Sequence, residues 1–255
     1  MSLVLVDRPE PGIARLCLNR PERRNAFDPQ VRDALLEACG QVAFDESVRA
    51  IVLGSANGVF CAGGDVTGMK DMSPEAGRQR MATSHRLVRM MLDCDKPIVA
   101  GVEGWAVGAG AGIALWADTI VLGENATIGI PFFKLGLVPD YAIFHTLPRR
   151  VGLAKARQIL LYGRNYKGGA ALAMGLADEI VPDADVATVA LERARELAAQ
   201  PRHAMSLTKR QLALWPTSLG PALEMENMAQ SLGFQTEDFT EGRTAFLEKR
   251  KPKFA

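Results

Sequence analysis

Two glycine-rich segments constrain this chain more than any other feature. They are residues 61–65 (CAGGD) and residues 108–112 (GAGAG), and each follows an apolar run rich in β-branched residues and leads toward a helical pattern. Glycines in such turns let backbone N–H groups come close to a ligand. The start of a helix adds unpaired N–H donors and a positive dipole end. Two such turns that meet would form a trap for one oxygen that gains negative charge.

The composition is that of an ordinary globular protein. The 255 residues include 30 basic and 29 acidic ones, so the net charge is +1, and 48% are hydrophobic. This length allows one large domain, alone or with a helical appendage. Because the charges balance, we expect neither a nucleic acid nor a membrane surface as a partner. The charge-free stretch at residues 104–117 is too short and too rich in glycine to span a bilayer.

The cysteines show no metal-binding or disulfide pattern. They form no C-x-x-C pair, and none lies near a histidine at metal-ligand spacing; they are Cys17, Cys39, Cys61 and Cys94. We therefore expect reduced thiols, no metal and no redox cofactor. The beginning of the chain has neither the basic start nor the long apolar stretch of a signal peptide. Both observations favour a cytoplasmic protein.

Strands and helices alternate from residue 50 onward, which predicts an α/β fold with parallel strands. The predicted strands are at residues 3–7, 13–18, 50–54, 97–102, 119–122 and 127–129. Helices are predicted at residues 29–44, with Asp28 as the N-cap, at 79–92, and from the second glycine segment to about 117. Later helices are predicted at 154–162, 168–175, 186–199, 203–214 and, as a pair, within 219–250. We divide the chain into an α/β core at 1–200 and a helical C-terminal region at 201–255.

An ordered set of short motifs resembles the crotonase (enoyl-CoA hydratase/isomerase) superfamily. The motifs are LNRP at 18–21, NAF at 25–27, FCAGGD at 60–65, KPIVAGV at 96–102, AVGAG at 106–110, LGLVPD at 135–140, GLAD at 175–178 and FLEKR at 246–250. Each motif alone is weak, but the set covers most of the chain in order. The resemblance implies a crotonase-type spiral of ββα units and a helical C-terminal trimerisation region. It also implies an acyl-CoA substrate, with coenzyme A as part of that substrate, and a homotrimer or a dimer of trimers.

The resemblance also assigns the binding site residue by residue. The two oxyanion N–H groups fall on Gly64 and Ala109. Positions that contact coenzyme A in the family correspond to Arg24, Ala26, Ala62, Asp65, Val66, Phe246 and Lys249. Two of these have a structural alternative. Asp65 could instead cap the next turn, and Lys249 could belong to a solvated basic tail.

The expected reaction depends on which acid is present. The two glutamates of family hydratases correspond here to Gly112 and Phe132, which cannot move a proton. We therefore expect only weak hydration. Residues 131–140 (PFFKLGLVPD) are similar to the isomerase branch, closest to the phenylacetyl-CoA epoxide isomerases, in which an aspartate matches Asp140. That carboxylate would take a proton from one carbon and return it two carbons away on the same face.

The environment of Asp140 is predicted to be apolar. If the rings of Phe132, Tyr141 and Phe144 face the substrate, scarce water would favour the neutral acid and raise the pKa of Asp140. The alternative is that Asp140 only caps a helix beginning at Tyr141. Relatives usually have small residues at 141–145, so bulk here would reshape the acyl pocket, for example for an aromatic or cyclic group. His145 is a further candidate acid or base, with packing on its helix as the alternative.

Two other functions compete with this interpretation. A nicotinamide-binding oxidoreductase would use the strand at 98–102, the loop at 108–113 and Glu124, but the third glycine of that fingerprint is replaced by Ile113. It also leaves the CAGGD segment unexplained. A CoA-thioester binder without catalytic power is the non-enzyme alternative, because both hydratase glutamates are absent.

Overall fold

A twisted, mostly parallel sheet forms the centre of the molecule. The computed structural model describes residues 2–70 and 72–254. Six strands pair in the order β1 (Val4–Glu10), β2 (Ile13–Leu18), β3 (Ala50–Ser55), β4 (Ile98–Val102), β6 (Thr119–Gly123) and β9 (Glu179–Val181). Only β1 runs antiparallel to its neighbour, β2. All five residues of β4 are buried, as expected of a parallel strand that is covered on both faces. The predicted α/β alternation is confirmed.

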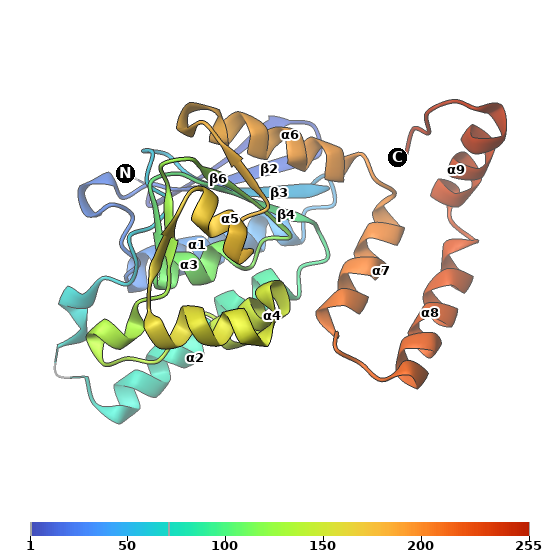
Figure 1. Ribbon diagram of the computed structural model, residues 1–255. Helices are drawn as coiled ribbons and strands as arrows, with labels where there is room; N and C mark the ends of the chain where they lie inside the picture. The colour runs from blue at the N-terminus through green and yellow to red at the C-terminus, as the bar shows by residue number, and fades with distance from the viewer. Residues whose placement is uncertain (1, 71, 255) are drawn as a thin grey trace.

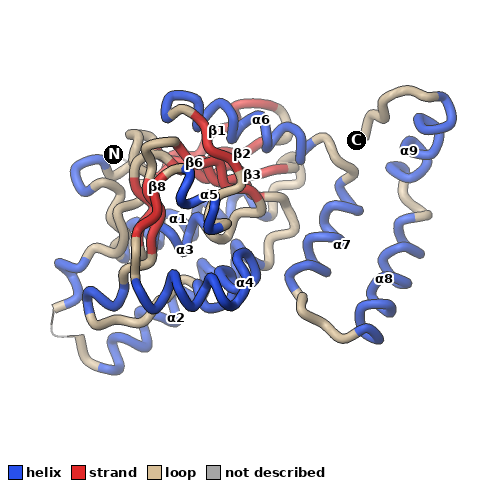
Figure 2. Tube along the Cα trace, in the orientation of Figure 1, coloured by secondary structure: helices blue, strands red, loops and turns tan. Residues whose placement is uncertain are grey.

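A second, smaller sheet lies beside the first (Figure 2). It joins β5 (Trp105–Val107), β7 (Thr127–Gly129) and β8 (Asn165–Lys167). Of these three strands only β7 was predicted. The others, like β9, have three residues each. That is too short for an alternating pattern to emerge from the sequence.

Helices cover both faces of the main sheet (Figure 1). On one face α1 (Pro29–Ala43) packs against β1 and β2, and α2 (Pro74–Leu92) packs against α1. On the other face α6 (Val186–Ala198) lies across β3, β4 and β6. The short helices α3 (Ala109–Ala114) and α5 (Gly169–Met174) follow β5 and β8.

Two helices begin earlier than the sequence pattern predicted. Helix α2 begins at Pro74, where the Ser73 side chain accepts a hydrogen bond from the Ala76 N–H. Helix α4 (Ile143–Tyr162) contains Pro148 and a non-helical Gly152, at which the helix is kinked. These two residues interrupt the helical pattern, so only the part after 154 was predicted.

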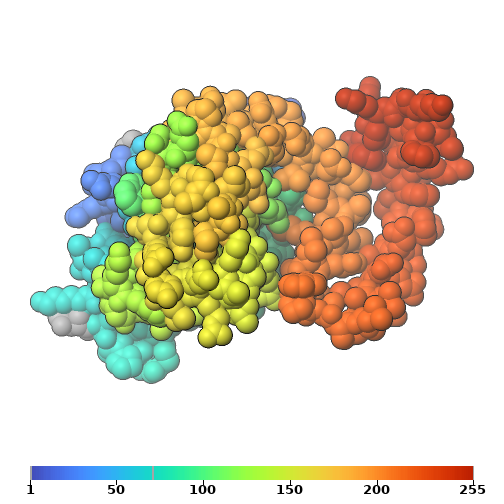
Figure 3. Space-filling view, in the orientation of Figure 1, coloured from blue at the N-terminus to red at the C-terminus, as the bar shows by residue number. Residues whose placement is uncertain are grey.

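The last three helices extend away from the core (Figures 1 and 3). They are α7 (Arg202–Ala213), α8 (Leu219–Gly233) and α9 (Glu237–Glu248). Within the described chain they bury a single residue, Ala245 of α9. The boundary predicted near residue 200 falls between α6 and α7, and the two-part organisation stays a prediction.

Outside residues 1, 71 and 255, no helix has both the length and the apolar character needed to cross a membrane.

Candidate active site

The two glycine-rich segments pack directly against each other. Cys61 pairs with β5: its N–H donates to the Trp105 carbonyl oxygen at 2.6 Å, and its own carbonyl oxygen accepts from the Val107 N–H at 3.1 Å. A Cβ atom on Gly110 would collide with this same Cys61 carbonyl. Only glycine at position 110 therefore allows α3 to begin this close to the CAGGD loop.

Both predicted oxyanion donors have unused N–H groups. Phe27 bridges the CAGGD loop: its N–H donates to the Gly63 carbonyl at 2.7 Å, and its carbonyl accepts from the Asp65 N–H at 3.1 Å. The N–H of Gly64, between them, therefore points away from this bridge. Ala109 is the first residue of α3, so its N–H has no partner within the helix. Among the described residues, neither N–H donates a hydrogen bond.

The predicted coenzyme A positions in the core lie around this loop. The Ala62 N–H donates to the Arg24 carbonyl oxygen at 3.1 Å. Arg24, Ala62 and Val66 are exposed, as contact with a soluble ligand requires. Asp65 also caps the 3-10 turn η2 (Val66–Met69), because its carboxylate accepts from the Thr67 N–H at 3.1 Å. Asp65 therefore caps the next turn, as its alternative prediction said, and it also lies in the CAGGD loop.

One arginine, from the LNRP motif, joins the segments of this region. The guanidinium of Arg20 donates to the Ala26 carbonyl at 2.9 Å and to the Asp65 carboxylate at 3.0 Å, and it lies 3.1 Å from the Asp28 carboxylate. Hydrogen bonds from Thr67, with a smaller contribution from Arg20, lower the pKa of Asp65. Arg20 was not predicted as a site residue.

Asp140 lies in the turn between η3 (Phe132–Leu135) and α4, and it does not cap the helix. Helix α4 begins at Ile143 rather than at Tyr141, and its N-cap residue is Ala142, without a side-chain cap. The Asp140 Oδ1 atom is buried and has no hydrogen-bond partner in the described part of the chain. Burial raises the pKa of Asp140 to about 6, against the opposing charge of Arg80. The structure therefore agrees with the predicted direction of the pKa shift.

Apolar groups fill the two positions that correspond to the hydratase glutamates. Phe132 is 9% exposed, and its ring lies 3.8 Å from where a Cβ atom on Gly108 would be. A Cβ atom on the buried Gly112 would lie 2.7 Å from the Cβ atom of Tyr141 and 3.4 Å from the side chain of Ile143. Position 112 is thus closed to any side chain in this structure.

The aromatic surroundings of Asp140 differ from the prediction in one residue. Tyr141 is 4% exposed, but Phe144 is 60% exposed and faces away from the interior. His145 is also exposed, and its Nδ1 atom lies 2.8 Å from the Arg149 guanidinium. His145 therefore packs on its own helix, as its alternative prediction said.

The two predicted C-terminal binding residues do not join this site within one chain. Phe246 is 82% exposed on α9, and Lys249 ends that helix as an exposed residue. Helix α9 stands far from the glycine loops in Figure 1.

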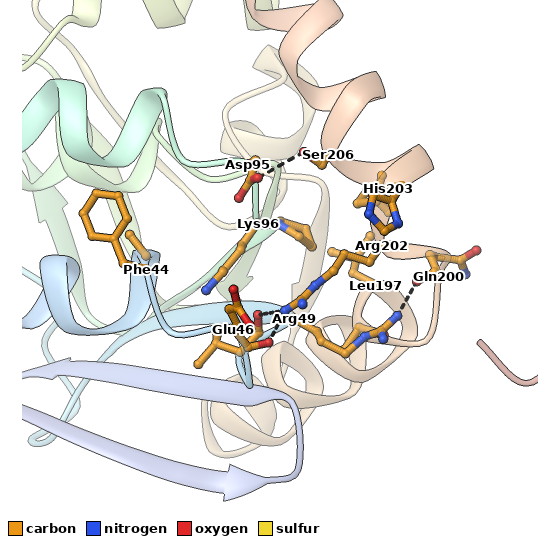
Figure 4. Close-up of a pocket in the computed structure, with 15 residues that line it drawn as sticks. Phe44, Glu46, Arg49, Asp95, Lys96, Leu197, Gln200, Arg202, His203 and Ser206 are labelled. Atoms are coloured by element: carbon orange, nitrogen blue, oxygen red, sulfur yellow. Dashed lines mark hydrogen bonds between the residues drawn. The ribbon is translucent and has the colours of Figure 1, made fainter. Parts of the chain in front are cut away.

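The cavities beside α7 are also separate from Asp140. One of about 320 Å³ is lined by the end of α1, the start of β3 and the start of α7 (Figure 4). Its cations bind backbone carbonyls: Arg49 Nε donates to Ala198 at 2.7 Å, and Arg202 donates to Glu46 and to Val48, the latter at 3.1 Å. These bonds fasten the α6–α7 junction to the core.

Comparison with known proteins identifies the family. The family model described as Enoyl-CoA hydratase/isomerase matches residues 8–255. The chain belongs to the enoyl-CoA hydratase/isomerase family. A 1,2-epoxyphenylacetyl-CoA isomerase from Escherichia coli is 34% identical, over 100% of this chain and 99% of that protein. A short-chain-enoyl-CoA hydratase from Clostridium acetobutylicum is 31% identical, over 95% of this chain and 94% of that protein.

The solved structures of this family share the fold. The crystal structure of an enoyl-CoA hydratase from Bacillus anthracis matches with a TM-score of 0.93 and 27% identity, over 99% of this chain and 98% of that one. The crotonase fold predicted from the motifs is therefore confirmed, and the nicotinamide-binding alternative is wrong about the fold. Because similar members of the family are named both isomerases and hydratases, membership alone leaves the reaction open.

Proposed function

We propose that this member of the enoyl-CoA hydratase/isomerase family is an acyl-CoA isomerase. It shifts a double bond, or isomerises a related ring system, through an enolate. The observation that carries the proposal is the pair formed by Asp140 and Gly112. Asp140 offers one half-buried carboxylate, of which one oxygen is buried and unpartnered, and position 112 is closed to a second acid. The named isomerase that resembles the chain over its whole length supports the same choice.

The reaction proceeds in two proton transfers. In a 3-enoyl-CoA substrate, the Asp140 carboxylate removes a proton from C2, and the electron pair of that C–H bond moves toward the thioester oxygen. The N–H groups of Gly64 and Ala109 stabilise this enolate oxygen, at about 3 kcal/mol for each well-aligned donor. The neutral Asp140 then delivers its proton to C4, which leaves the conjugated 2-enoyl thioester and restores the carboxylate. No cofactor besides the coenzyme A of the substrate is required.

A substitution of the base tests the proposal. The conjugated product is followed by its absorbance, with 3-enoyl-CoA substrates of several chain lengths and with aromatic acyl groups. Asp140→Asn should bind the acyl-CoA as the wild type does and turn over at least about 100-fold more slowly, since it removes the base. Unchanged turnover in this variant would contradict the role of Asp140.

Two further outcomes separate the alternatives. Brisk hydration of crotonyl-CoA by the wild type would favour a hydratase. Tight CoA-ester binding without turnover of any of the substrates would favour a non-catalytic binder.

A further inference from the structure

Tyr141 contacts the helix that carries Ala109 directly, and it reaches the Gly64 loop through Phe27. It follows Asp140 in the chain, and its Cβ atom abuts Gly112 of α3, the helix that begins at Ala109. Its ring meets the Phe27 ring edge-on, with the centroids 5.5 Å apart. Phe27 is in turn bridged by backbone hydrogen bonds to the residues on either side of Gly64. One side chain thus links the base to both donor-bearing segments.

The position of Tyr141 is fixed from the backbone as well. The Trp116 Nε1–H donates to the Tyr141 carbonyl oxygen at 3.0 Å, and the two rings lie 6.1 Å apart. Tyr141 and Ala142 both have positive φ angles, of 51° and 63°. In this left-handed turn the side chain of Tyr141 is directed inward, and it is 4% exposed. Such strain in residues that carry side chains persists only where the surrounding packing holds it in place.

The side chain of Tyr141 also occupies the space beside Gly112, where a water-activating acid would lie. A Cβ atom at position 112 would meet Tyr141 Cβ at 2.7 Å, so the space beside α3 is occupied. The buried Oδ1 atom of Asp140 has no polar partner in the described chain. This oxygen of the carboxyl group is therefore shielded from solvent.

We propose that Tyr141 is a positioning residue that seals the reaction site from water and so confines the transferred proton to Asp140. This inference rests on the proposed isomerase function and adds the feature that keeps the transferred proton from exchanging with water. In a sealed site, the proton that Asp140 takes from C2 has nowhere to go except C4. Where water enters, the neutral Asp140 exchanges its proton with solvent before C4 is protonated, and a water molecule can also reach the acyl carbons.

The test follows the proton itself. A 3-enoyl-CoA carrying deuterium at C2 is converted in ordinary water, and mass spectrometry measures the deuterium at C4 of the conjugated product. Wild type should retain most of the label. Tyr141→Phe keeps the ring and removes only the hydroxyl, so it should retain the label equally. Tyr141→Leu and Tyr141→Ala should place at least about fivefold more solvent hydrogen at C4, because water then reaches Asp140.

The outcomes separate this inference from the function on which it rests. Wild type that does not isomerise ends both. Wild type that isomerises but places solvent hydrogen at C4 as freely as Tyr141→Leu overturns only the sealing role. If Tyr141→Ala does not fold, the comparison of wild type, Tyr141→Phe and Tyr141→Leu decides the question. Equal retention in all three also overturns the inference, since a residue that merely fills the core would change stability without changing the source of the proton.

Discussion

The Asp140 carboxyl is placed where an ionised group is costly for folding and useful for proton transfer. One of its oxygens is buried without a partner in the described residues, and the resulting pKa of about 6 lies well above the ordinary value of 3.8. A base with a pKa nearer to neutral gains driving force for removing a proton from carbon. The same shift must lower stability wherever the carboxyl is ionised.

Asp140→Asn should therefore stabilise the protein in a pH-dependent way. Because the folded-state pKa of about 6 exceeds the ordinary 3.8, wild type loses stability as the pH rises between these two values. The asparagine variant lacks this loss, and its advantage should grow from about 0.5 kcal/mol at pH 4 to about 3 kcal/mol at pH 7. Denaturant unfolding of both proteins across this range measures it. An advantage that does not vary with pH would show that burial does not shift this pKa.

The direction of this pKa shift could be predicted from the apolar residues around Asp140. How those residues pack could not be predicted. Phe144 was expected to face inward and is 60% exposed, whereas Tyr141 is 4% exposed. The difference comes from the left-handed turn at Tyr141 and Ala142, which delays α4 until Ile143. In that turn Tyr141 contacts Gly112 and Trp116, which are distant in sequence, so no local pattern reveals its packing.

At the scale of elements, three separate segments meet at Arg20. It holds the Ala26 carbonyl, the Asp28 carboxylate at the start of α1 and the Asp65 carboxylate beside the Gly64 donor. Its side chain is 16% exposed, so the two carboxylates would lose a largely buried partner without it. A largely buried cation that binds groups on two loops holds both loops in place.

Arg20→Met should loosen the CAGGD loop and reduce kcat/KM at least about tenfold, since it leaves two carboxylates without their shared cation. The pH midpoint set by Asp140 should stay where it is, because Arg20 is not among the groups that shift its pKa. Arg15→Met is the matched control. Arg15 pairs with Asp7 across the edge strand β1 and its neighbour β2, and its loss should leave kinetics unchanged. Equal kinetics for the two variants would remove Arg20 from this role.

The elements that could be predicted are those with a strong local pattern. The apolar runs that became β3 and β4 and the Asp28 cap of α1 needed no tertiary information. Strands β5, β8 and β9 needed it, since three residues form a strand only when a neighbouring edge offers hydrogen bonds. The proposed oxyanion donors were assigned from the resemblance, because a free N–H at Gly64 or Ala109 leaves no trace in composition.

At the scale of the whole molecule, α8 packs only lightly on α7 and exposes apolar side chains. Four of them are more than half exposed: Leu219, Leu223, Met228 and Leu232. The α6–α7 junction, from which this region extends, is nevertheless fastened to the core through Arg49 and Arg202. A helix that exposes this many apolar side chains favours burial against another chain. The homotrimer implied by the family resemblance would supply that burial, and it could bring Phe246 and Lys249 to a neighbour's ligand.

Leu223→Glu combined with Met228→Glu should lower the molar mass of the particle in sedimentation equilibrium from a trimer, or a multiple of it, to a single chain. Both side chains are already exposed in one chain, so the fold of the protomer should remain intact. Glu226→Gln, on the same helix, is the control and should keep the assembly. Wild type that sediments as a single chain would contradict the trimer.

The contact between Tyr141 and Gly112 also restricts the order in which this protein could change during evolution. The obstruction at position 112 is the Cβ atom of Tyr141, which every residue except glycine carries. An acid at 112 is therefore accessible only after residue 141 has become glycine, a replacement that its left-handed backbone already accommodates. In the reverse order, the intermediate would force the side chains of residues 112 and 141 into the same space. The order of the two changes is therefore fixed, in whichever direction they occur.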